Sequence, residues 1–366
     1  MKIAIFTIND STNYGNRLQN YALQKVLFKY ADVVDTIWWS RRHYLIDEIK
    51  NSIKFIAKYI LNWKNLKRYY IEDCIREYNI KKFSNRYINI KYDYKIKTNL
   101  DKEYDYFIVG SDQVWNFNFW NGWDSIENSI NAIFLKFASK KKRIAYAASI
   151  AVPNISEDKK IIFKQNLNEM KAISMREKSG AELVKKLMGR EVPVVVDPTI
   201  LLSKEEWQKI ELKPEWYSGE KYIFTYFLGN PSPVIEKIAK KNNWKIYNLM
   251  DKDNFNLYTS RVEEFVYLIN HAQLVATDSF HGTVFSILMN TPFLVINRKE
   301  KGVVDMTSRI DTLLELFGYQ DRYIINGECD LSDEEILNMD FSNVKAIQER
   351  EIARSTEYIK KALNLK

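Results

Sequence analysis

The sequence predicts an α/β protein with two domains in tandem, each built on a parallel sheet. The chain has 366 residues, of which 46% are apolar and 28% are charged, a globular composition with room for two domains. Short apolar runs alternate with helical patterns in both halves, which is typical of parallel sheets. Asp197 and Pro198 interrupt the pattern, so we expect a first domain over residues 1–200 and a second over residues 201–366.

The first half opens with a β-α-β pattern. Residues 3–8 form an apolar run, polar turn residues follow, and Leu18, Tyr21 and Val26 share one face of a helix that begins near residue 17. The other elements expected in this half are strands over residues 33–38, 104–110, 143–150 and 192–196, and a helix over residues 157–178.

The second half repeats this alternation and ends in a charged helical tail from about residue 341. Two open α/β domains in tandem predict a ligand cleft between them, because ligands bind at the carboxyl ends of the strands in such sheets. The expected strands cover residues 222–228, 244–249, 274–277 and 293–296, and the expected helices cover residues 233–241, 261–270, 281–289 and 307–317.

Positive charge is concentrated in residues 41–97, which interrupt the first domain as a basic helical insertion. The chain carries a net charge of +8, and this stretch contains 15 Lys or Arg against 6 Asp or Glu. Apolar residues recur there at helical spacing, while Lys50, Lys54 and Lys58 fall on another face. A solvated surface helix, a helix on an anionic membrane surface and a nucleic-acid-binding segment all fit this pattern. No known motif supports the last, so we expect no nucleic-acid partner.

Composition excludes several classes of protein. Cys74 and Cys329 are the two cysteines and the chain has three histidines, so the sequence predicts neither a disulfide scaffold nor a zinc finger. It contains no apolar run long enough to span a membrane, and its first residues lack the apolar region of a signal peptide. We therefore expect a cytoplasmic protein without a metal or other cofactor.

Polar segments that follow two of the predicted strands are candidates for chemistry. Asn13, Gly15 and Asn16 precede a helix, where free N–H groups favour an anion, although the same residue types also serve as simple caps. Residues 110–116 carry side chains that bind and stack on sugars or stabilise a turn, and the acid among them is placed to accept a proton from a hydroxyl. These side chains are Asp112, Gln113, Trp115 and Asn116.

Residues 277–283 are the sharpest of these segments. A strand, a polar loop and a helix start follow one another, which puts His281 at a helix N-terminus that faces the cleft. A lone histidine is more often structural than catalytic, but the polar cluster around this one favours a functional role. The N–H groups of the same helix start favour a bound anion beside the neighbouring residues Ser279, Phe280 and Gly282.

Two basic sites would add positive potential to the cleft. Arg176 lies at or just beyond the end of the helix over residues 157–178, where its guanidinium binds a phosphate or carboxylate or pairs with Glu177. Residues 297–302 carry further basic side chains, and this segment either lines the cleft or is an ordinary solvated loop.

The ordered set of these segments resembles the polysaccharide pyruvyl transferase family. No single segment is specific, but their order is fairly specific and extends over residues 1–318. The resemblance implies a fold similar to that of GT-B glycosyltransferases, with two Rossmann-like domains that face each other across a cleft. The matching segments are residues 13–15, 19–23, 110–116, 174–177, 195–199 and 277–282.

The resemblance also implies transfer of pyruvate from phosphoenolpyruvate to a sugar of a cell-surface polysaccharide or its lipid-linked precursor, as a ketal. By family analogy His281 is the general acid that protonates the enol ether carbon, since histidines titrate near pH 6.5, and Asp112 orients or deprotonates the acceptor. The predicted donor site comprises Arg176, Ser279, Phe280, Gly282, Asn13, Gly15 and Asn16, and the predicted acceptor site comprises Gln113, Trp115 and Asn116.

One departure from the family and two other functions stay open. Several family members carry an Arg where this chain has Ser279, so Arg176, Arg17 or Arg298 must compensate or the donor differs. A sugar-nucleotide glycosyltransferase would share the architecture, although residues 283–296 contain no acid to hold a donor ribose. A non-catalytic glycan- or nucleic-acid-binding protein is the other alternative. If the chain is a pyruvyl transferase, its basic stretch would hold it at the inner face of the membrane, near lipid-linked acceptors.

Overall fold

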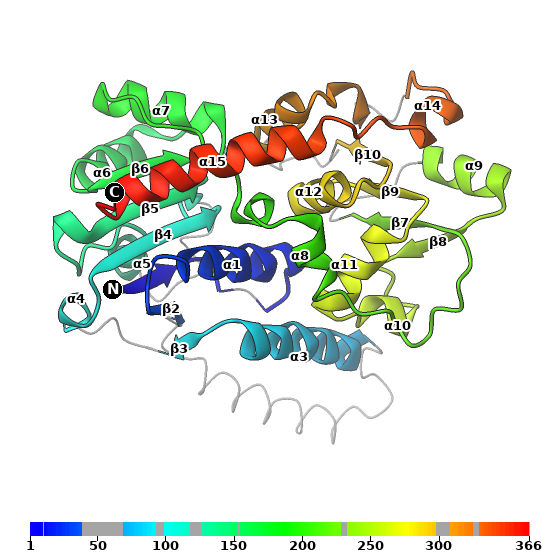
Figure 1. Ribbon diagram of the computed structural model, residues 1–366, viewed down its shortest axis with the longest axis horizontal. Helices are drawn as coiled ribbons and strands as arrows, with labels where there is room; N and C mark the ends of the chain where they lie inside the picture. Colours follow the sequence, from blue (N-terminus) through cyan, green and yellow to red (C-terminus); the bar gives the residue numbers. More distant parts are fainter. Residues whose placement is uncertain are drawn as a thin grey trace.

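The computed structural model shows two parallel sheets side by side, with helices around and between them (Figure 1). Within the described residues the first sheet has six strands in the order β3-β2-β1-β4-β5-β6, and the second has five in the order β11-β10-β9-β7-β8. These are the two common orders of doubly wound sheets, so the predicted fold of two Rossmann-like units is confirmed. The structure describes residues 1–9, 11–38, 69–92, 99–117, 126–152, 154–227, 233–297, 308–324 and 329–365.

The first sheet takes its strands from the first half of the chain. They are β1 (Lys2–Phe6), β2 (Val33–Trp38), β3 (Ile90–Tyr92), β4 (Tyr106–Asp112), β5 (Arg143–Ala148) and β6 (Ala172–Met175). The helices that accompany them are α1 (Tyr14–Leu27), α3 (Tyr69–Tyr87), α4 (Leu100–Glu103), α5 (Ile126–Ile133), α6 (Glu157–Leu167) and α7 (Lys178–Met188).

The second sheet follows a short link that contains the 3-10 turn η4 (Pro198–Leu201) and α8 (Lys204–Gln208). Its strands are β7 (Tyr222–Tyr226), β8 (Lys245–Asn248), β9 (Leu274–Thr277), β10 (Phe293–Ile296) and β11 (Tyr323–Ile324). Its helices are α9 (Pro233–Asn242), α10 (Phe255–Tyr258), α11 (Val262–Asn270), α12 (Phe280–Met289), α13 (Ser308–Phe317), α14 (Asp333–Leu337) and α15 (Val344–Ala362).

The predicted helix over residues 157–178 is wrong, because this segment contains two elements. α6 ends at Leu167, and residues 172–175 form β6, the last strand of the first sheet. The side chains of Ile173 and Met175 are buried in the core of that sheet, so the apolar run serves a strand and not a helix face. Residues 192–196, predicted as a strand, meet the sheet through a single parallel bridge between Met175 and Val194.

The basic insertion predicted over residues 41–97 falls partly outside the described residues. Residues 41–68, which include the lysine face of the expected amphipathic helix, lie outside them, so contact with a membrane stays a prediction. Residues 69–92 are part of the fold, because β3 pairs with β2 and α3 packs against α1 and α11. Among the described residues, no helix is both long enough and apolar enough to cross a membrane.

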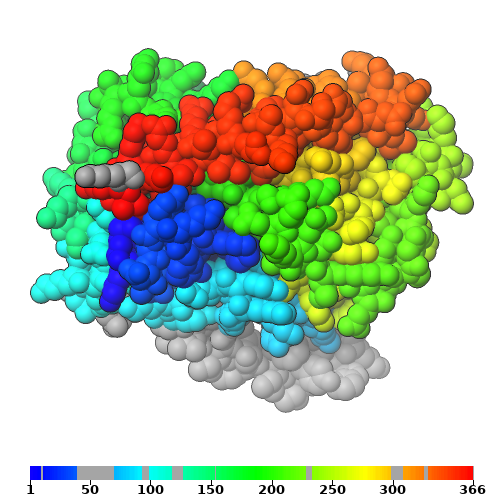
Figure 2. All heavy atoms as spheres, in the orientation of Figure 1, coloured from blue at the N-terminus to red at the C-terminus, as the bar shows by residue number. Residues whose placement is uncertain are grey.

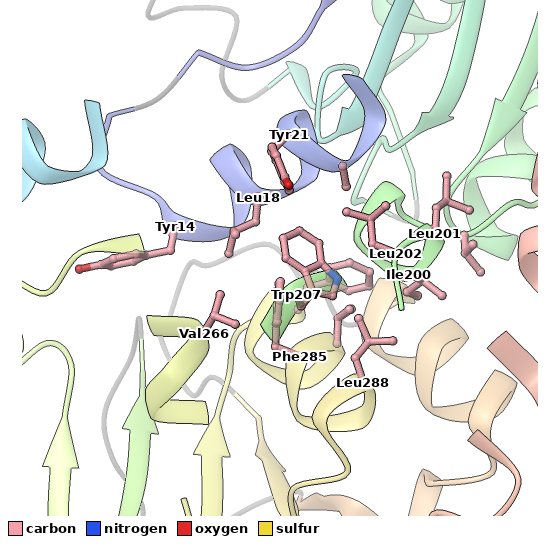
Figure 3. Packing of buried hydrophobic residues seen from close by; sticks show 14 of the residues in the cluster. Tyr14, Leu18, Tyr21, Ile200, Leu201, Leu202, Trp207, Val266, Phe285 and Leu288 are labelled. Carbon is pink, nitrogen blue, oxygen red and sulfur yellow. The ribbon is translucent and has the colours of Figure 1, made fainter. Parts of the chain in front are cut away.

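An apolar seam joins the two halves of the molecule. Leu18 and Tyr21 of α1 face Trp207 of α8, which packs on Phe285 of α12, while Tyr14 lies farther along the same cluster, as Figure 3 shows. The ring of Tyr14 also stacks on Phe265 of α11 at a centroid distance of 5.2 Å. Because these side chains are large and buried, they fix the start of α1 opposite the start of α12.

The last helix, α15, crosses the junction between the halves. Figure 2 shows it as a continuous ridge over both of them, and Figure 1 shows that it ends near β5. Tyr358 Oη donates a hydrogen bond to the carbonyl of Ala145 (2.7 Å), and Gln348 Nε2 donates to the carbonyls of Ile200 and Leu202 (both 2.9 Å). The sequence placed this tail with the second domain, whereas its hydrogen bonds tie it to β5 and to the link between the sheets.

Candidate active site

Four charged or titratable side chains from both halves meet in the interior. Asp112 is the last residue of β4, Arg176 directly follows β6, and Asp197 precedes η4. His281 lies in the first turn of α12, which follows β9 of the other sheet, as expected from the sequence. The carboxyl ends of parallel strands share one edge of a sheet, which is why residues so distant in the chain come together here.

Arg176 is the centre of this cluster. Its Nη1 donates to Asp197 Oδ2 at 2.8 Å, and its Nη2 donates to Asp112 Oδ1 at 3.1 Å. The side chains of Arg176 and Asp197 are only 1% and 0% exposed. On another side, the guanidinium carbon lies 4.5 Å from the ring centroid of Phe280, so the cation also packs on an aromatic face.

Asp197 is held by donors on both carboxylate oxygens. Ser111 Oγ donates to its Oδ2 (3.0 Å), while the backbone N–H and Oγ1 of Thr199 donate to its Oδ1 (3.1 and 2.8 Å). Burial acts to raise the pKa of Asp197, but the charges of His281 and Arg176 outweigh it and hold the pKa far below its ordinary value. This carboxylate is therefore ionised at any physiological pH.

Asp112 is similarly fixed. Its Oδ2 accepts a hydrogen bond from Asn16 Nδ2 at 3.0 Å, in addition to the contact with Arg176. Burial acts to raise the pKa of Asp112, but Arg176, His281 and the Asn16 hydrogen bond together lower it. A lowered pKa weakens a carboxylate as a base, and the predicted role of Asp112 in orienting or deprotonating the acceptor stays a prediction. The geometry also suits positioning of Arg176.

Two buried nitrogen atoms in the cluster lack a hydrogen-bond partner within the described part of the chain. They are Nε2 of His281 and Nε of Arg176. The imidazole nitrogen lies 3.7 Å from Asp197 Oδ1, which is longer than a hydrogen bond. Buried polar atoms are nearly always satisfied in proteins, and such orphans at strand ends indicate a place where a ligand binds.

A cavity of about 370 Å³ adjoins the cluster, between α7, α13 and α15. Its walls are largely apolar and include Val195, Ile200 and Leu313. The charged residues that line it are Arg176, Asp197, Arg309, Lys178, Glu315, Arg350, Glu351 and Arg354. A cavity of this size with apolar walls and several cations suits a small organic anion.

Comparison with known proteins identifies the family. A sequence model of the family described as polysaccharide pyruvyl transferase matches residues 13–300. The chain belongs to the polysaccharide pyruvyl transferase family. A search of curated proteins found no match to this pyruvyl transferase family member.

The solved structures similar to this family member include two UDP-GlcNAc 2-epimerases and a MurG. The epimerase from Neisseria meningitidis, bound to UDP-GlcNAc, is 12% identical, with 97% of this chain and 100% of that chain covered and a TM-score of 0.42. The epimerase from Methanocaldococcus jannaschii is 13% identical, with 98% and 100% covered and a TM-score of 0.46. MurG from Acinetobacter baumannii is 10% identical, with 100% and 95% covered and a TM-score of 0.41.

In this pyruvyl transferase family member, other protein atoms fill the space at the start of α1, which was predicted as part of the donor site. Asn13 caps the helix, since its side chain accepts a hydrogen bond from the backbone N–H of Asn16 at 3.1 Å. A Cβ atom at Gly15 would lie 2.2 Å from Cγ and from Nδ1 of His281, so the imidazole packs directly on this backbone. The helix start therefore faces His281 and not an open anion site.

The residues around His281 have mainly local roles. Ser279 caps α12, because its Oγ accepts a hydrogen bond from the backbone N–H of Gly282 at 3.4 Å. A Cβ atom at Gly282 would meet Thr277 Oγ1 at 2.7 Å, which explains why a glycine fits there. Phe280 is the member of this group that lines the cavity.

Trp115 is a core residue, so the structure gives no support to its predicted contact with the acceptor. Its side chain is 0% exposed, its Nε1 donates to the carbonyl of Ile133 at 3.0 Å, and its ring stacks on Phe134. It belongs to the core beneath the first sheet. Asn116 Nδ2 donates to Gln113 Oε1 at 2.9 Å, and a role for this pair in acceptor binding stays a prediction.

The sequence analysis did not identify Asp197 and Arg309 as residues of the site. Asp197 was treated as a domain break, although an acid directly after a buried valine run is a signal for a strand-end site. Arg309 lies on a helix whose sequence gives no sign of the cavity. Two other arginines were predicted to compensate for the arginine that several family members carry at position 279. Arg17 is buried against Trp38 and donates to the carbonyl of Ile8. Arg298 lies outside the described residues.

Proposed function

We propose that this protein transfers pyruvate from phosphoenolpyruvate to a sugar of a cell-surface polysaccharide or its lipid-linked precursor, as a ketal. The observation that carries the donor assignment is the imidazole Nε2 of His281, which has no hydrogen-bond partner among the described residues and lies 3.7 Å from Asp197. Asp197 lines a cavity that also contains several cations. A proton donor beside an anion-binding cavity is what protonation of an anionic enol ether requires.

In the first step, His281 gives the proton on Nε2 to the methylene carbon of phosphoenolpyruvate. The C=C bond is converted to a C–H bond, and positive charge develops at C2 as an oxocarbenium-like centre. Asp112 and Asp197 are both ionised, so they stabilise this charge electrostatically as it develops. Their fixed hydrogen bonds keep the carboxylates in place, so little reorganisation is needed in the transition state.

In the second step, one sugar hydroxyl attacks C2 and its proton restores the imidazolium. The bond between C2 and the phosphate oxygen then breaks, and a second hydroxyl attacks C2 to close the ketal. The departing phosphate takes the proton of that second hydroxyl. Over the whole reaction the methyl group and the phosphate gain one proton each, and the two hydroxyls lose one each.

The proposal is tested by calorimetric binding of phosphoenolpyruvate, UDP and GDP to the wild type and to His281→Gln. We expect phosphoenolpyruvate alone to bind, and we expect the variant to retain that binding. Phosphate release is then followed with oligosaccharides that carry free hydroxyl pairs, and His281→Gln should lower its rate at least about 100-fold. Binding of UDP or GDP without phosphoenolpyruvate would overturn the proposal and favour a sugar-nucleotide glycosyltransferase.

A further inference from the structure

We propose that Thr199 is a positioning residue: it occupies the carboxylate oxygen of Asp197 that lies nearest to His281 and so leaves the proton on the imidazole Nε2 free for the donor. This inference rests on the proposed function and deepens it, because it names the residue that keeps the proton available. Thr199 lies in η4, two residues after Asp197, and is 0% exposed. With no surface for a substrate to contact, it acts on the reaction through Asp197.

The argument depends on the lone pairs of Asp197 Oδ1, the oxygen that lies 3.7 Å from Nε2 of His281. A carboxylate oxygen has two lone pairs that accept hydrogen bonds. Oδ1 accepts two hydrogen bonds from Thr199, one from its backbone N–H at 3.1 Å and one from its Oγ1 at 2.8 Å. Both lone pairs are therefore taken, and the imidazole N–H finds no vacant acceptor on this atom.

The other oxygen of Asp197 is occupied as well. Its Oδ2 accepts hydrogen bonds from Nη1 of Arg176 at 2.8 Å and from Oγ of Ser111 at 3.0 Å. The Ser111 hydroxyl also lies 3.2 Å from the carbonyl of Ala147, which is a weaker acceptor than a carboxylate. Four donors thus surround the carboxylate, which explains why the buried Nε2 of His281 has no hydrogen-bond partner within the described part of the chain.

This arrangement separates two tasks that one hydrogen bond often performs together. A histidine beside a carboxylate commonly donates an N–H to it, and that bond fixes the ring. Here the ring is held by packing, since a Cβ atom at Gly15 would lie 2.2 Å from Cγ and from Nδ1 of His281. The negative charge of Asp197 stays close, while the Nε2 proton can pass to the methylene carbon of the donor without first breaking a hydrogen bond to Asp197.

The turn itself does not require the hydroxyl of Thr199. Asp197 is the N-cap of η4, and Pro198 occupies the first position, where a backbone N–H would have no partner. The backbone N–H of residue 199 is the donor that such a cap accepts. The carbonyl of Thr199 accepts a hydrogen bond from Trp207 Nε1 at 3.0 Å, which fixes the turn against the apolar seam. The second hydrogen bond to Oδ1 is therefore additional to the cap.

The test is Thr199→Val, which replaces the hydroxyl with a methyl group and keeps the backbone N–H. One lone pair of Asp197 Oδ1 becomes vacant, and a shift of about 1 Å brings Nε2 of His281 within hydrogen-bond distance. We expect kcat to fall at least about tenfold, because the proton must then leave a hydrogen bond to a charged group. KM for phosphoenolpyruvate should change little, and Thr199→Ser, which restores the hydroxyl, should recover most of kcat.

Nuclear magnetic resonance of protein with isotope-labelled histidine reports this hydrogen bond directly. The Nε2 proton of His281, assigned by its loss in His281→Gln, should move downfield in Thr199→Val, because a proton shared with a carboxylate is deshielded. Ser111→Ala frees a lone pair on the other oxygen and should cause a smaller shift. The matched control is Thr291→Val, beyond the far end of α12, where Oγ1 donates to the carbonyl of Ile269 at 2.9 Å; it should keep the spectrum and kcat of the wild type.

A second variant covers the case in which Thr199→Val does not fold, as judged by its thermal transition. Thr199→Cys then replaces it, because a thiol is only a weak hydrogen-bond donor. Unchanged kcat in the folded variant would overturn this inference alone. An unchanged imidazole signal would overturn it too, since a loss of kcat would then be structural. A wild type that binds no phosphoenolpyruvate would instead overturn the proposed function, and with it the role of the Nε2 proton.

Discussion

The backbone of Gly15 and the imidazole of His281 are in direct contact across the junction of the two halves, since a Cβ atom at position 15 would lie 2.2 Å from two ring atoms. Gly15 lies in the first turn of α1, and His281 lies in the first turn of α12. One helix start thus forms the wall against which the proposed proton donor rests. The packing of the two halves therefore sets the position of the proposed proton donor.

Gly15→Ala should therefore reduce activity without unfolding the protein. The methyl group forces the imidazole to move by about 1 Å to restore normal contact distances, and a displacement of that size costs roughly 100-fold in rate. Alanine favours a helix over glycine by about 1 kcal/mol, which offsets part of the strain. Steady-state kcat and the thermal midpoint, measured on the same preparation, check both expectations.

The double variant Gly15→Ala with His281→Ala shows whether the effect passes through the imidazole. With the ring removed, the added methyl group has space, so its effects on activity and on stability should vanish in that background. Equal losses in both backgrounds would mean that Gly15 acts through some other contact.

Asp197→Asn should destabilise the fold, because Arg176 then loses one of its two buried carboxylates. Removal of one partner of a buried ion pair typically lowers the free energy of unfolding by about 3 kcal/mol. Urea denaturation at pH 7 measures the loss. Asp158→Asn is a suitable control, since that carboxylate is exposed and its replacement should leave the urea midpoint nearly unchanged.

The stability difference between the wild type and Asp197→Asn should depend on pH. The folded pKa of Asp197 is far below the ordinary value of 3.8, so the stabilisation is fully present above that value. As the pH falls below about 4, the unfolded carboxylate takes up a proton while the folded one does not, and the stabilisation decreases. The urea midpoints of the wild type and of Asp197→Asn, measured at pH 7, 5, 4 and 3, should approach each other only at the acidic end. A constant difference over that range contradicts the assignment.

The fold was predictable from the sequence because buried strands and amphipathic helices leave strong local patterns. The strands at residues 33–38, 274–277 and 293–296 have the predicted bounds. The error at residues 157–178 arose because β6 is short and its apolar residues continue the spacing of the helix before it. Whether a short apolar segment forms a strand or a helix depends on the sheet that it joins. The other strands of that sheet lie far away in the sequence.

The candidate site was predictable in its parts but not in its arrangement. His281 and Arg176 were identified from strand-end and helix-start chemistry, and the structure brings both to Asp197. The two carboxylates around Arg176 and the approach of Arg309 depend on how two sheets pack, which no local pattern contains. Trp115 was misplaced for a similar reason, since an indole beyond a strand end has the same sequence signature in a core as on a surface.

Trp115→Phe distinguishes a core residue from an acceptor ligand. The change removes the hydrogen bond to Ile133 and part of the ring packing on Phe134, so the free energy of unfolding should fall by about 2 kcal/mol. The KM for the acceptor should stay unchanged, because the side chain does not reach the surface. Urea denaturation and acceptor saturation curves provide the two measurements. A raised acceptor KM with unchanged stability would restore the original sugar-stacking prediction.

Arg76 of α3 joins the two halves of the molecule, because it contacts α1 and the end of α10. Its Nη1 donates to the carbonyl of Tyr258 at 2.9 Å, and its Cζ lies 4.7 Å from the ring centroid of Tyr14. Tyr14 itself donates from Oη to the carbonyl of Ser260 at 2.7 Å, so α3, α1 and the end of α10 are tied together. This contact should hold the halves in the alignment that places Gly15 against His281.

Arg76→Met keeps the aliphatic stem and removes the charge and the donors. We expect the free energy of unfolding in urea to fall by about 2 kcal/mol, from the lost charged hydrogen bond and the lost contact with two aromatic rings. Arg86→Met, on the exposed side of the same helix, is the matched control and should change stability little. If alignment matters for chemistry, Arg76→Met also lowers kcat, and its effect combined with Gly15→Ala is smaller than the sum of the two, because both displace the same imidazole. Equal stability losses in the two arginine variants would show that Arg76 contributes as an ordinary helix residue and not as a link between the halves.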